Sequence, residues 1–290
     1  MNYRHAYHAG NFADVVKHWV FALAIDHLKR KDAPFRIIDT HAGRGRYQLA
    51  AAEANKTLEW RQGIARLIGP DAEPLPRELA KALKIYLDVV RGENVPGALA
   101  CYPGSPAIAQ ALLRAQDTLV ANEAHPEELK HLAADLGRAR RGTVKLSGLD
   151  GWVGLRALLP PPERRGVILI DPPFEQDGEL HRLVTGLKEG LARFGTGVFI
   201  AWYPIKDAKT PRRLIKSVAE IAPQKLLSLE VLIRQPRNPD ALNGCGLLVT
   251  NPPFTLEGEL KIAGPALVRR LAAGPGANCS VRWVKALHTD

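Results

Sequence analysis

Short apolar runs that alternate with helical segments constrain the fold of this chain more than any other feature. Runs rich in Val, Ile and Leu predict seven strands, at residues 35–39, 118–122, 143–148, 166–170, 198–203, 225–233 and 245–250. Segments with helical periodicity separate most of them, including residues 11–30, 126–136 and 179–194. Strands that alternate with helices in this way predict an α/β protein with a doubly wound, mostly parallel sheet.

Composition limits the class of protein. A chain of 290 residues with 46% hydrophobic residues is long enough for one large domain, or for a domain with an insertion. No apolar run approaches the roughly 20 residues of a membrane span, and the N-terminus lacks the apolar core of a signal peptide. Three widely spaced cysteines without a CxxC pair make a disulfide framework or a structural zinc site unexpected. We therefore expect a cytoplasmic, monomeric protein with no metal and no membrane partner.

The charge balance favours a polyanionic partner. The chain carries 40 basic and 30 acidic residues, a formal net charge of +10. Basic proteins of this kind bind nucleic acids because neutralising phosphates releases counterions. Basic residues cluster at Arg164-Arg165, at Arg212-Arg213 and between Arg234 and Arg237. Solvated helix ends and loops are the alternative interpretation of these clusters.

The most specific chemical motif is Asp171-Pro172-Pro173-Phe174, which directly follows the predicted strand 166–170. Neither proline can donate a backbone hydrogen bond, so the strand ends there in a stiff, extended turn. In open α/β sheets, ligands bind at the carboxyl ends of strands. The Asp171 carboxylate and the Pro172 carbonyl can accept both hydrogens of an exocyclic amine while Phe174 stacks on a flat base. This pattern is typical of methyltransferases that act on planar amino groups.

A second copy, Asn251-Pro252-Pro253-Phe254, follows the last predicted strand. Only one copy can serve a single site, and a motif match needs structural context. The first copy comes after the other candidate cofactor motifs in the expected order. We therefore assign the site to Asp171 and interpret Asn251 as a structural strand terminator.

A glycine-rich turn follows the first predicted strand. Asp39 ends that strand, and Gly43 and Gly45 allow a positive φ and a close approach of the backbone to a ligand. Strand, acid, Gly-x-Gly and helix make up the first motif of Rossmann-like cofactor folds. Gln48 stands where the dinucleotide fingerprint has its third glycine, which a pyrophosphate requires. S-adenosylmethionine therefore fits this turn better than NAD.

Acidic residues end the next two predicted strands. Glu123 suits bidentate hydrogen bonding to a ribose diol, and Asp150 with the Gly151 N–H suits the adenine of the cofactor. Each has an alternative explanation: Asp150 could cap the following helix, Glu123 could be a loop acid, and His41 could be a core histidine. The order of the motifs along the chain favours the functional interpretation.

The spacing of the motifs indicates an insertion. An acid that binds ribose normally lies about 20 residues after the glycines, whereas Glu123 lies much further along. Residues 48–100 are predicted to form an inserted helical subdomain with helices at 58–68 and 78–90. It would act as a lid or as an RNA contact, or it would simply stabilise the fold. Residues 1–47 and 101–290 would form the Rossmann-like domain.

Three segments resemble one known family. They are residues 3–18, Asp39-Thr40-His41-Ala42-Gly43 and Tyr102-Pro103-Gly104-Ser105-Pro106. They resemble the family of bacterial ribosomal RNA large-subunit methyltransferase J, and the resemblance covers nearly the whole chain. It implies a class I S-adenosylmethionine-dependent methyltransferase fold. It also implies formation of N6-methyladenine in 23S ribosomal RNA, where the family target is adenine 2030.

The resemblance also implies roles for individual residues. Asp171 would be catalytic, supported by Pro172 and Phe174, and Tyr3 would contact the substrate together with Phe174. The residues expected to bind S-adenosylmethionine are His18, His41, Gly43, Ser105, Glu123, Asp150 and Gly151. Phe174 departs from the family, which often has Tyr there; stacking survives and a hydroxyl is lost.

Four alternatives remain open. The substrate could be adenine in DNA or a protein glutamine, since related motifs serve both. The chain could be a non-catalytic RNA-binding protein that keeps the fold, or a nicotinamide dehydrogenase. A metal site at His5, His8 and His18 lacks the carboxylate or cysteine pattern that would support it.

Overall fold

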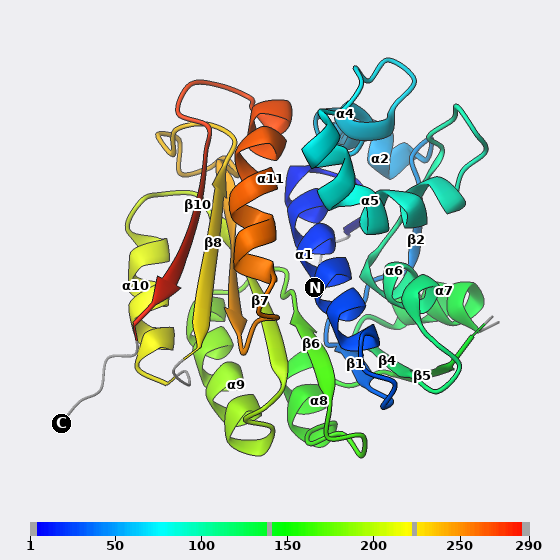
Figure 1. Ribbon diagram of the computed structural model, residues 1–290, viewed down its shortest axis with the longest axis vertical. Helices are drawn as coiled ribbons and strands as arrows, with labels where there is room; N and C mark the ends of the chain where they lie inside the picture. Colours follow the sequence, from blue (N-terminus) through cyan, green and yellow to red (C-terminus); the bar gives the residue numbers. More distant parts are fainter. Residues whose placement is uncertain (1–4, 138–140, 222–224, 286–290) are drawn as a thin grey trace.

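The structure is a computed structural model that describes residues 5–137, 141–221 and 225–285 (Figure 1). An eight-stranded sheet in the order β10-β8-β9-β7-β6-β1-β4-β5 forms its centre. The neighbours from β7 to β5 are parallel, and β9, β8 and β10 are each antiparallel to the strands beside them. The strands are β1 (Arg36–Asp39), β4 (Thr118–Asn122), β5 (Thr143–Ser147), β6 (Gly166–Ile170), β7 (Val198–Ile205), β8 (Leu226–Leu232), β9 (Gly244–Thr250) and β10 (Asn278–Val284).

The predicted α/β class and all seven predicted strands are confirmed, and the structure adds an eighth strand. This strand, β10, lies at the edge of the sheet and pairs with β8 from Asn278 to Val284. No residue of β10 is fully buried. An edge strand needs little apolar surface, and the mixed sequence of β10 therefore lacks the apolar run by which the other strands were predicted.

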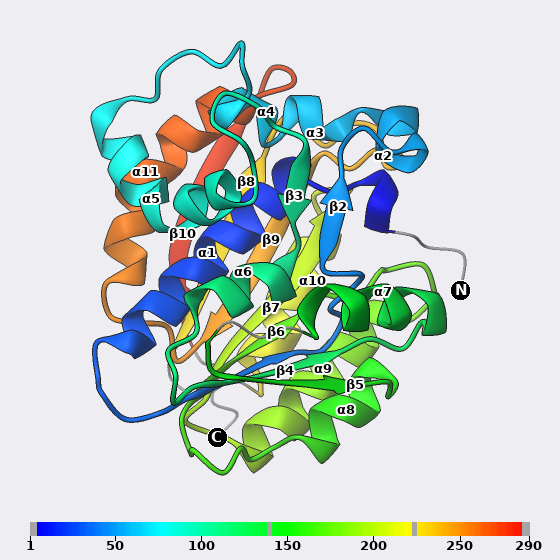
Figure 2. The same ribbon diagram turned by 90° about the vertical axis from the view of Figure 1, so that its right-hand side faces the viewer.

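Helices cover both faces of the sheet (Figures 1 and 2). One face packs against α1 (Phe12–Lys29), α6 (Ser105–Leu112), α7 (Pro126–Leu136) and α11 (Leu256–Leu271), and the other against α8 (Gly151–Ala157), α9 (Glu179–Arg193) and α10 (Thr210–Ala219). Alternate side chains of β6 enter different cores: Val167 and Leu169 face α1, whereas Ile168 and Ile170 face α8 and α9. Because both faces of these strands are buried, their sequences are continuous apolar runs.

Helix α1 is held in place at its first turn. The Asn11 side chain accepts hydrogen bonds from the Ala13 and Asp14 N–H groups at 2.9 and 3.0 Å, as expected of an N-cap. Because the helix starts there, Asp14, Lys17 and His18 lie on neighbouring turns and are buried.

The region 48–100 contains four helices: α2 (Ala52–Thr57), α3 (Glu59–Gln62), α4 (Ala65–Ile68) and α5 (Arg77–Gly92). The antiparallel pair β2 (Arg46–Gln48) and β3 (Cys101–Pro103) brackets it. Helix α5 packs against α1, α6 and α11, outside the helical layer of the sheet. No helix among the described residues is long and apolar enough to cross a membrane.

The predicted continuous helix over 58–68 is wrong. It is interrupted at Gly63, between α3 and α4. The segment Gly10-Asn11 passes directly over this point, and the Gly10 carbonyl accepts a hydrogen bond from the Ile64 N–H at 2.9 Å. A tertiary contact therefore overrides the local helical propensity.

Strand direction separates the two Pro-Pro-Phe motifs. Asp171 follows β6, which is parallel to β1 and β4, whereas Asn251 follows the antiparallel strand β9. Thr250 pairs with Phe199 near the start of β7, so Asn251 lies at the opposite edge of the sheet. Its amide donates to the carbonyls of Gly195 and Gly197 at 2.8 and 2.9 Å, a structural role.

The close approach at Gly63 generates a stability prediction. A Cβ atom at this position would lie 2.1 Å from the Gly10 carbonyl oxygen and 2.7 Å from the Asn11 Cα. We expect Gly63→Ala to lower the free energy of unfolding by about 1–3 kcal/mol. Gly92→Ala is the control, because nothing lies within 4 Å of the Cβ site and the residue ends helix α5. Urea denaturation of both variants checks this, and equal effects would contradict it.

Candidate active site

A cavity of about 660 Å³ opens at the carboxyl edge of the sheet. This is a typical size for a site that binds small molecules. Its walls come from the N-terminal segment and α1, the glycine turn after β1, the ends of β4, β6 and β7, and the loop between β8 and β9. Among the predicted site residues, the lining contains His18, His41, Gly43, Ser105, Glu123, Asp171, Pro172 and Phe174.

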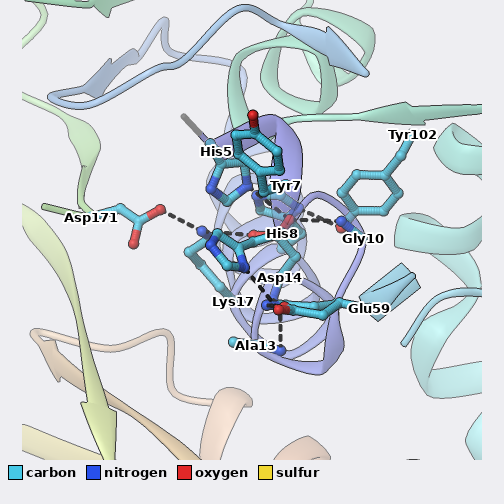
Figure 3. A network of polar contacts seen from close by, with 12 residues as sticks. His5, Tyr7, His8, Gly10, Ala13, Asp14, Lys17, Glu59, Tyr102 and Asp171 are labelled. Carbon is cyan, nitrogen blue, oxygen red and sulfur yellow. Dashed lines mark hydrogen bonds and ion pairs between the residues drawn. The ribbon is translucent and has the colours of Figure 1, made fainter. Parts of the chain in front are cut away.

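A buried ion-pair network connects Asp171 to helix α1 (Figure 3). The Lys17 ammonium contacts an Asp171 oxygen on one side and an Asp14 oxygen, at 2.9 Å, on the other. The second Asp14 oxygen accepts from the Gly10 N–H and pairs with His5 Nε2, both at 2.9 Å. The side chains of Lys17 and Asp14 are only 4% and 2% exposed, so water screens these charges little.

The pKa values in this network reflect mutual stabilisation. Burial opposes the charged form of Asp14, yet His5 and Lys17 hold the pKa of its carboxyl well below the ordinary value. Burial likewise opposes the ammonium of Lys17, but Asp14 and Asp171 raise the pKa of Lys17 above its ordinary value. Asp14 and Lys17 are therefore both charged at neutral pH, and the Lys17 ammonium lies between the side chains of Asp14 and Asp171.

His18 is part of a second, uncharged network. Its Nδ1 lies 2.7 Å from the Tyr102 hydroxyl, which is 3.0 Å from the hydroxyl of Tyr86 on α5. Burial lowers the pKa of His18 to about 3, so the imidazole is neutral at physiological pH. This chain of hydrogen bonds joins the cavity wall to the 48–100 region.

The glycine turn is fixed by Glu123. Its carboxylate accepts hydrogen bonds from the Gly43 and His125 N–H groups at 2.8 and 2.7 Å. Gly43 has φ +64°, and a Cβ there would lie 2.3 Å from the Tyr47 hydroxyl, so this position requires glycine. Burial raises the pKa of Glu123 above its ordinary value. The alternative interpretation of Glu123 as an exposed loop acid is excluded, because the residue is only 8% exposed.

Asp39 and His41 lie between the glycine turn and Asp171. Burial, together with the negative charge of Asp171, raises the pKa of Asp39 to about 7, although hydrogen bonds from Ser105 and the His41 N–H partly offset this. Burial lowers the pKa of His41 to about 4, and its Nδ1 lies 2.8 Å from the Thr40 hydroxyl. A neutral imidazole therefore lines the cavity, and a carboxyl group that titrates near neutrality is fully buried next to it.

Asp150 and Gly151 lie behind His41 rather than in the cavity lining. One Asp150 oxygen accepts from the N–H groups of Trp152 and Val153 at 3.0 and 3.1 Å, so this residue does cap helix α8. A Cβ on Gly151 would lie 2.3 Å from His41 Nε2, which shows how closely the imidazole packs there. The exposed side chain of Asp150 lies next to the partly exposed, apolar Val153.

The turn after β6 carries an aromatic ring to the cavity. Phe174 has φ +53°, an uncommon conformation for a bulky residue, and its N–H donates to Glu179 of α9 at 3.1 Å. The ring meets Trp202 of β7 edge-to-face, with 5.5 Å between centroids. In the second motif the positive φ occurs at Asn251 instead, so the same residue pattern forms a different turn.

The sequence did not identify several residues of this site. The pairing of Lys17 with Asp171 joins residues 154 positions apart, and nothing local in the sequence signals it. Trp202 and Arg234 also line the cavity, and only the basic cluster around Arg234 was visible in the sequence. Tyr3, predicted to contact the substrate, lies outside the described residues. In the part of the chain that is described, no group of three His, Cys, Asp or Glu side chains is arranged to hold a metal.

Comparisons with known proteins agree on one family. Residues 32–285 match the family model described as ribosomal RNA large subunit methyltransferase D, RlmJ. The chain is 40% identical to ribosomal RNA large subunit methyltransferase J of Escherichia coli, over 98% of this chain and 99% of that protein. It is 36% identical to the Haemophilus influenzae protein of the same name, with the same coverage. A Legionella pneumophila crystal structure, 34% identical, superposes with a TM-score of 0.83 over 96% of this chain and 98% of that one.

The ammonium between two carboxylates should be essential for stability. Lys17→Met would leave the buried Asp14 and the partly buried Asp171 without the ammonium that pairs with both. We expect the free energy of unfolding at pH 7 to fall by about 3–5 kcal/mol. Lys84→Met is the matched control: Lys84 pairs with Asp88 on the surface, and its loss should cost less than about 0.5 kcal/mol. Similar losses in the two variants, measured by urea denaturation, would show that the network is not stabilising.

The raised pKa of Asp39 predicts a pH dependence. Between the unfolded pKa of about 4 and the folded pKa of about 7, the folded chain keeps a proton that the unfolded chain releases. The free energy of unfolding should therefore fall as pH rises through this window, by at most about 4 kcal/mol, and should level off above it. Asp39→Asn should remove the part of this pH dependence that comes from Asp39. Denaturation curves from pH 4.5 to 8 test it, and parallel profiles for the two proteins would refute it.

Proposed function

Because the chain belongs to the family of ribosomal RNA large subunit methyltransferase D, RlmJ, we propose that it methylates N6 of an adenine in 23S ribosomal RNA, at the family target adenine 2030. Its membership of this family makes it an S-adenosylmethionine-dependent ribosomal RNA methyltransferase. The base, the position and the roles of individual residues are our proposals, and they are supported by the chemistry of the cavity.

The cofactor half of the cavity fits S-adenosylmethionine. Bound there, this molecule supplies an electrophilic methyl group on a sulfonium. The glycine turn at Gly43 offers backbone without a side chain, and Glu123 at its edge would accept hydrogen bonds from the ribose hydroxyls. Ser105, His18 and the neutral His41 complete this wall. Asp150 and Gly151 would bind the adenine beyond His41, next to the apolar surface of Val153.

The substrate half is built around Asp171. A flipped-out adenine would stack on Phe174, as enzymes that modify a base take it out of its stack. The Asp171 oxygen that does not contact Lys17 and the Pro172 carbonyl would accept the two N6 hydrogens. This would turn the nitrogen lone pair toward the methyl donor. The carboxylate would receive the proton that N6 loses as the bond from carbon to nitrogen forms and the bond from carbon to sulfur breaks.

One observation carries this proposal: Asp171 is fixed by a buried ammonium at the rim of the cavity, beside an aromatic ring held in a strained turn. A carboxylate that only ended a strand would need neither feature. Strained backbone at a ligand-binding edge is typical of functional sites. Methylation of adenine in DNA is the second candidate, because Asp171, Pro172 and Phe174 would recognise the same base in either polymer.

The 48–100 region is proposed to organise the N-terminal part of the active site. Glu59 on α3 lies 2.9 Å from both His8 Nδ1 and the Asn11 amide nitrogen. His5, His8 and Glu59 all line the cavity. The insertion is thus part of the wall around the substrate half, which fits a role as a lid or RNA contact.

Replacing the proposed catalytic carboxylate tests the function. Asp171→Asn should lower kcat by about 100-fold or more, because the amide cannot accept a proton and offers one acceptor oxygen. The dissociation constant for S-adenosylmethionine should change less than threefold. The measurement is transfer of labelled methyl groups to protein-free 23S ribosomal RNA, followed by nucleoside analysis, with calorimetry for the cofactor.

The second motif provides the matched control. Phe174→Ala should lower methyl transfer, whereas Phe254→Ala, with an 80% exposed ring at the opposite edge of the sheet, should not.

A DNA oligonucleotide of the same sequence shows whether the protein methylates RNA or DNA. If the wild-type protein binds S-adenosylmethionine but labels no RNA, ribosomal RNA is excluded as the substrate of this site. If Asp171→Asn lowered the rate and the cofactor affinity equally, the role of Asp171 would be structural and not catalytic.

A further inference from the structure

A basic rim closes the cavity on the side away from the glycine turn. Lys206 follows β7 directly, and Arg234 lies two residues after β8. We propose that this rim binds a phosphodiester group of the substrate strand next to the target adenosine, with Arg234 as the principal contact. The inference rests on the proposed function, since it assumes a nucleic acid substrate, and it extends that function by locating the strand.

Sheet topology places the rim at a suitable distance from the base site. The strands β6, β7, β9 and β8 are neighbours in this order, and β8 runs in the same direction as β6 and β7. Asp171 and Arg234 therefore leave the same edge of the sheet, three strand spacings apart. At about 4.8 Å per spacing their backbones lie about 14 Å apart. An extended arginine side chain and one nucleotide together can span this separation.

The guanidinium of Arg234 has unused hydrogen-bonding capacity. Arg234 is half-buried, and its Nε is buried with no hydrogen-bond partner within the described ranges. Its Nη2 reaches the Leu242 carbonyl only at 3.4 Å. Buried donors in native proteins are almost always paired, so the unpaired Nε of a residue that lines a cavity indicates a missing acceptor. Phosphate oxygens match the planar fork of arginine, which binds them in a bidentate manner.

No carboxylate of the described residues is bonded to the two basic side chains of the rim. Neither Arg234 nor Lys206 forms an ion pair with a carboxylate in the part of the chain that the structure describes. Asp207 follows Lys206, but its carboxylate is bonded to the Lys209 and Thr210 N–H groups and to the Thr210 hydroxyl, at 2.6, 2.8 and 2.6 Å. The one acid that lines the cavity here is Asp240, which is exposed.

The rim is also pre-organised. Asn243, only 1% exposed, places its side-chain amide 2.9 Å from the Lys206 carbonyl and 2.6 and 3.1 Å from the carbonyls of Asn238 and Ala241. This side chain ties the loop between β8 and β9 to the end of β7. The two basic residues therefore lie on backbone that is fixed before the substrate arrives, which lowers the entropic cost of binding.

The experiment compares two arginines of one loop. Arg234→Gln removes the guanidinium from the cavity, and Arg237→Gln removes an exposed charge that does not line it. The probe is a short synthetic RNA that contains the methylated segment of 23S ribosomal RNA. It is made with natural linkages, and with a single uncharged methylphosphonate either 5′ or 3′ of the target adenosine. KM for methyl transfer and equilibrium RNA affinity are measured as a function of salt, with S-adenosylmethionine affinity as the folding control.

We expect Arg234→Gln to raise KM and the RNA dissociation constant about tenfold and to leave cofactor affinity unchanged. The slope of the logarithm of RNA affinity against the logarithm of salt concentration should become shallower by about one. Arg237→Gln should change these values less than twofold. One methylphosphonate should weaken wild-type binding about as much as Arg234→Gln does, and should weaken that variant no further. Asp240→Asn should tighten binding by removing a repulsive charge.

Two results would overturn the inference. If the losses of RNA affinity from Arg234→Gln and from each methylphosphonate were additive, Arg234 would contact neither linkage. If Arg234→Gln and Arg237→Gln weakened RNA binding equally, Arg234 would contribute only its charge and no specific contact. The failure of the proposed function is a separate result, since it would appear as absence of N6-methyladenosine with wild-type protein and natural RNA. In that case the equilibrium affinities still decide whether Arg234 binds a phosphodiester. If Arg234→Gln lost cofactor affinity, the methylphosphonate series on wild-type protein would decide alone.

Discussion

The buried ammonium of Lys17 joins the parts of the molecule that form the site. It lies between Asp14 of its own helix and Asp171 at the end of β6, with its side chain 4% exposed. A single charge thereby fixes the direction of the N-terminal segment and the orientation of the carboxylate that we propose to be catalytic. Removing Lys17 leaves the buried charge of Asp14 without its ammonium partner, which is why position and chemistry are coupled here. The helix N-cap at Asn11 and the contact at Gly63 serve the same arrangement, because both determine where α1 begins.

The two Pro-Pro-Phe motifs show how topology gives function to a local pattern. Both end a fully buried strand, and both carry an aromatic ring. The strands run in opposite directions, so one motif reaches the ligand-binding edge and the other the far edge. There Asn251 binds two backbone carbonyls, and Phe254 projects into solvent. The motif has its chemical meaning only together with the direction of its strand.

Much of this arrangement could be predicted from the sequence because parallel strands bring their carboxyl ends together. Asp39 ends β1, and Glu123 and Asp171 follow β4 and β6. These strands are neighbours in the sheet, so the order of the motifs implied one edge. Tertiary contacts were not predictable in this way. The helix over 58–68 breaks because Gly10 crosses it, and β10 lacks an apolar run because it is an edge strand. The partner of Lys17 is 154 residues away, and the unpaired Nε of Arg234 depends on how a loop packs.

The long sequence separation between Lys17 and Asp171 has a consequence for synthesis of the chain. Helix α1 leaves the ribosome early, yet one of the two carboxylates that neutralise its buried ammonium is made 154 residues later. Until then the apolar surface of α1 lacks the strand β6 that will pack against it, and Asp14 of the same helix is the carboxylate available to Lys17. The ion-pair network that orients the side chain of Asp171 can therefore be completed only after the strand that carries this residue has been made.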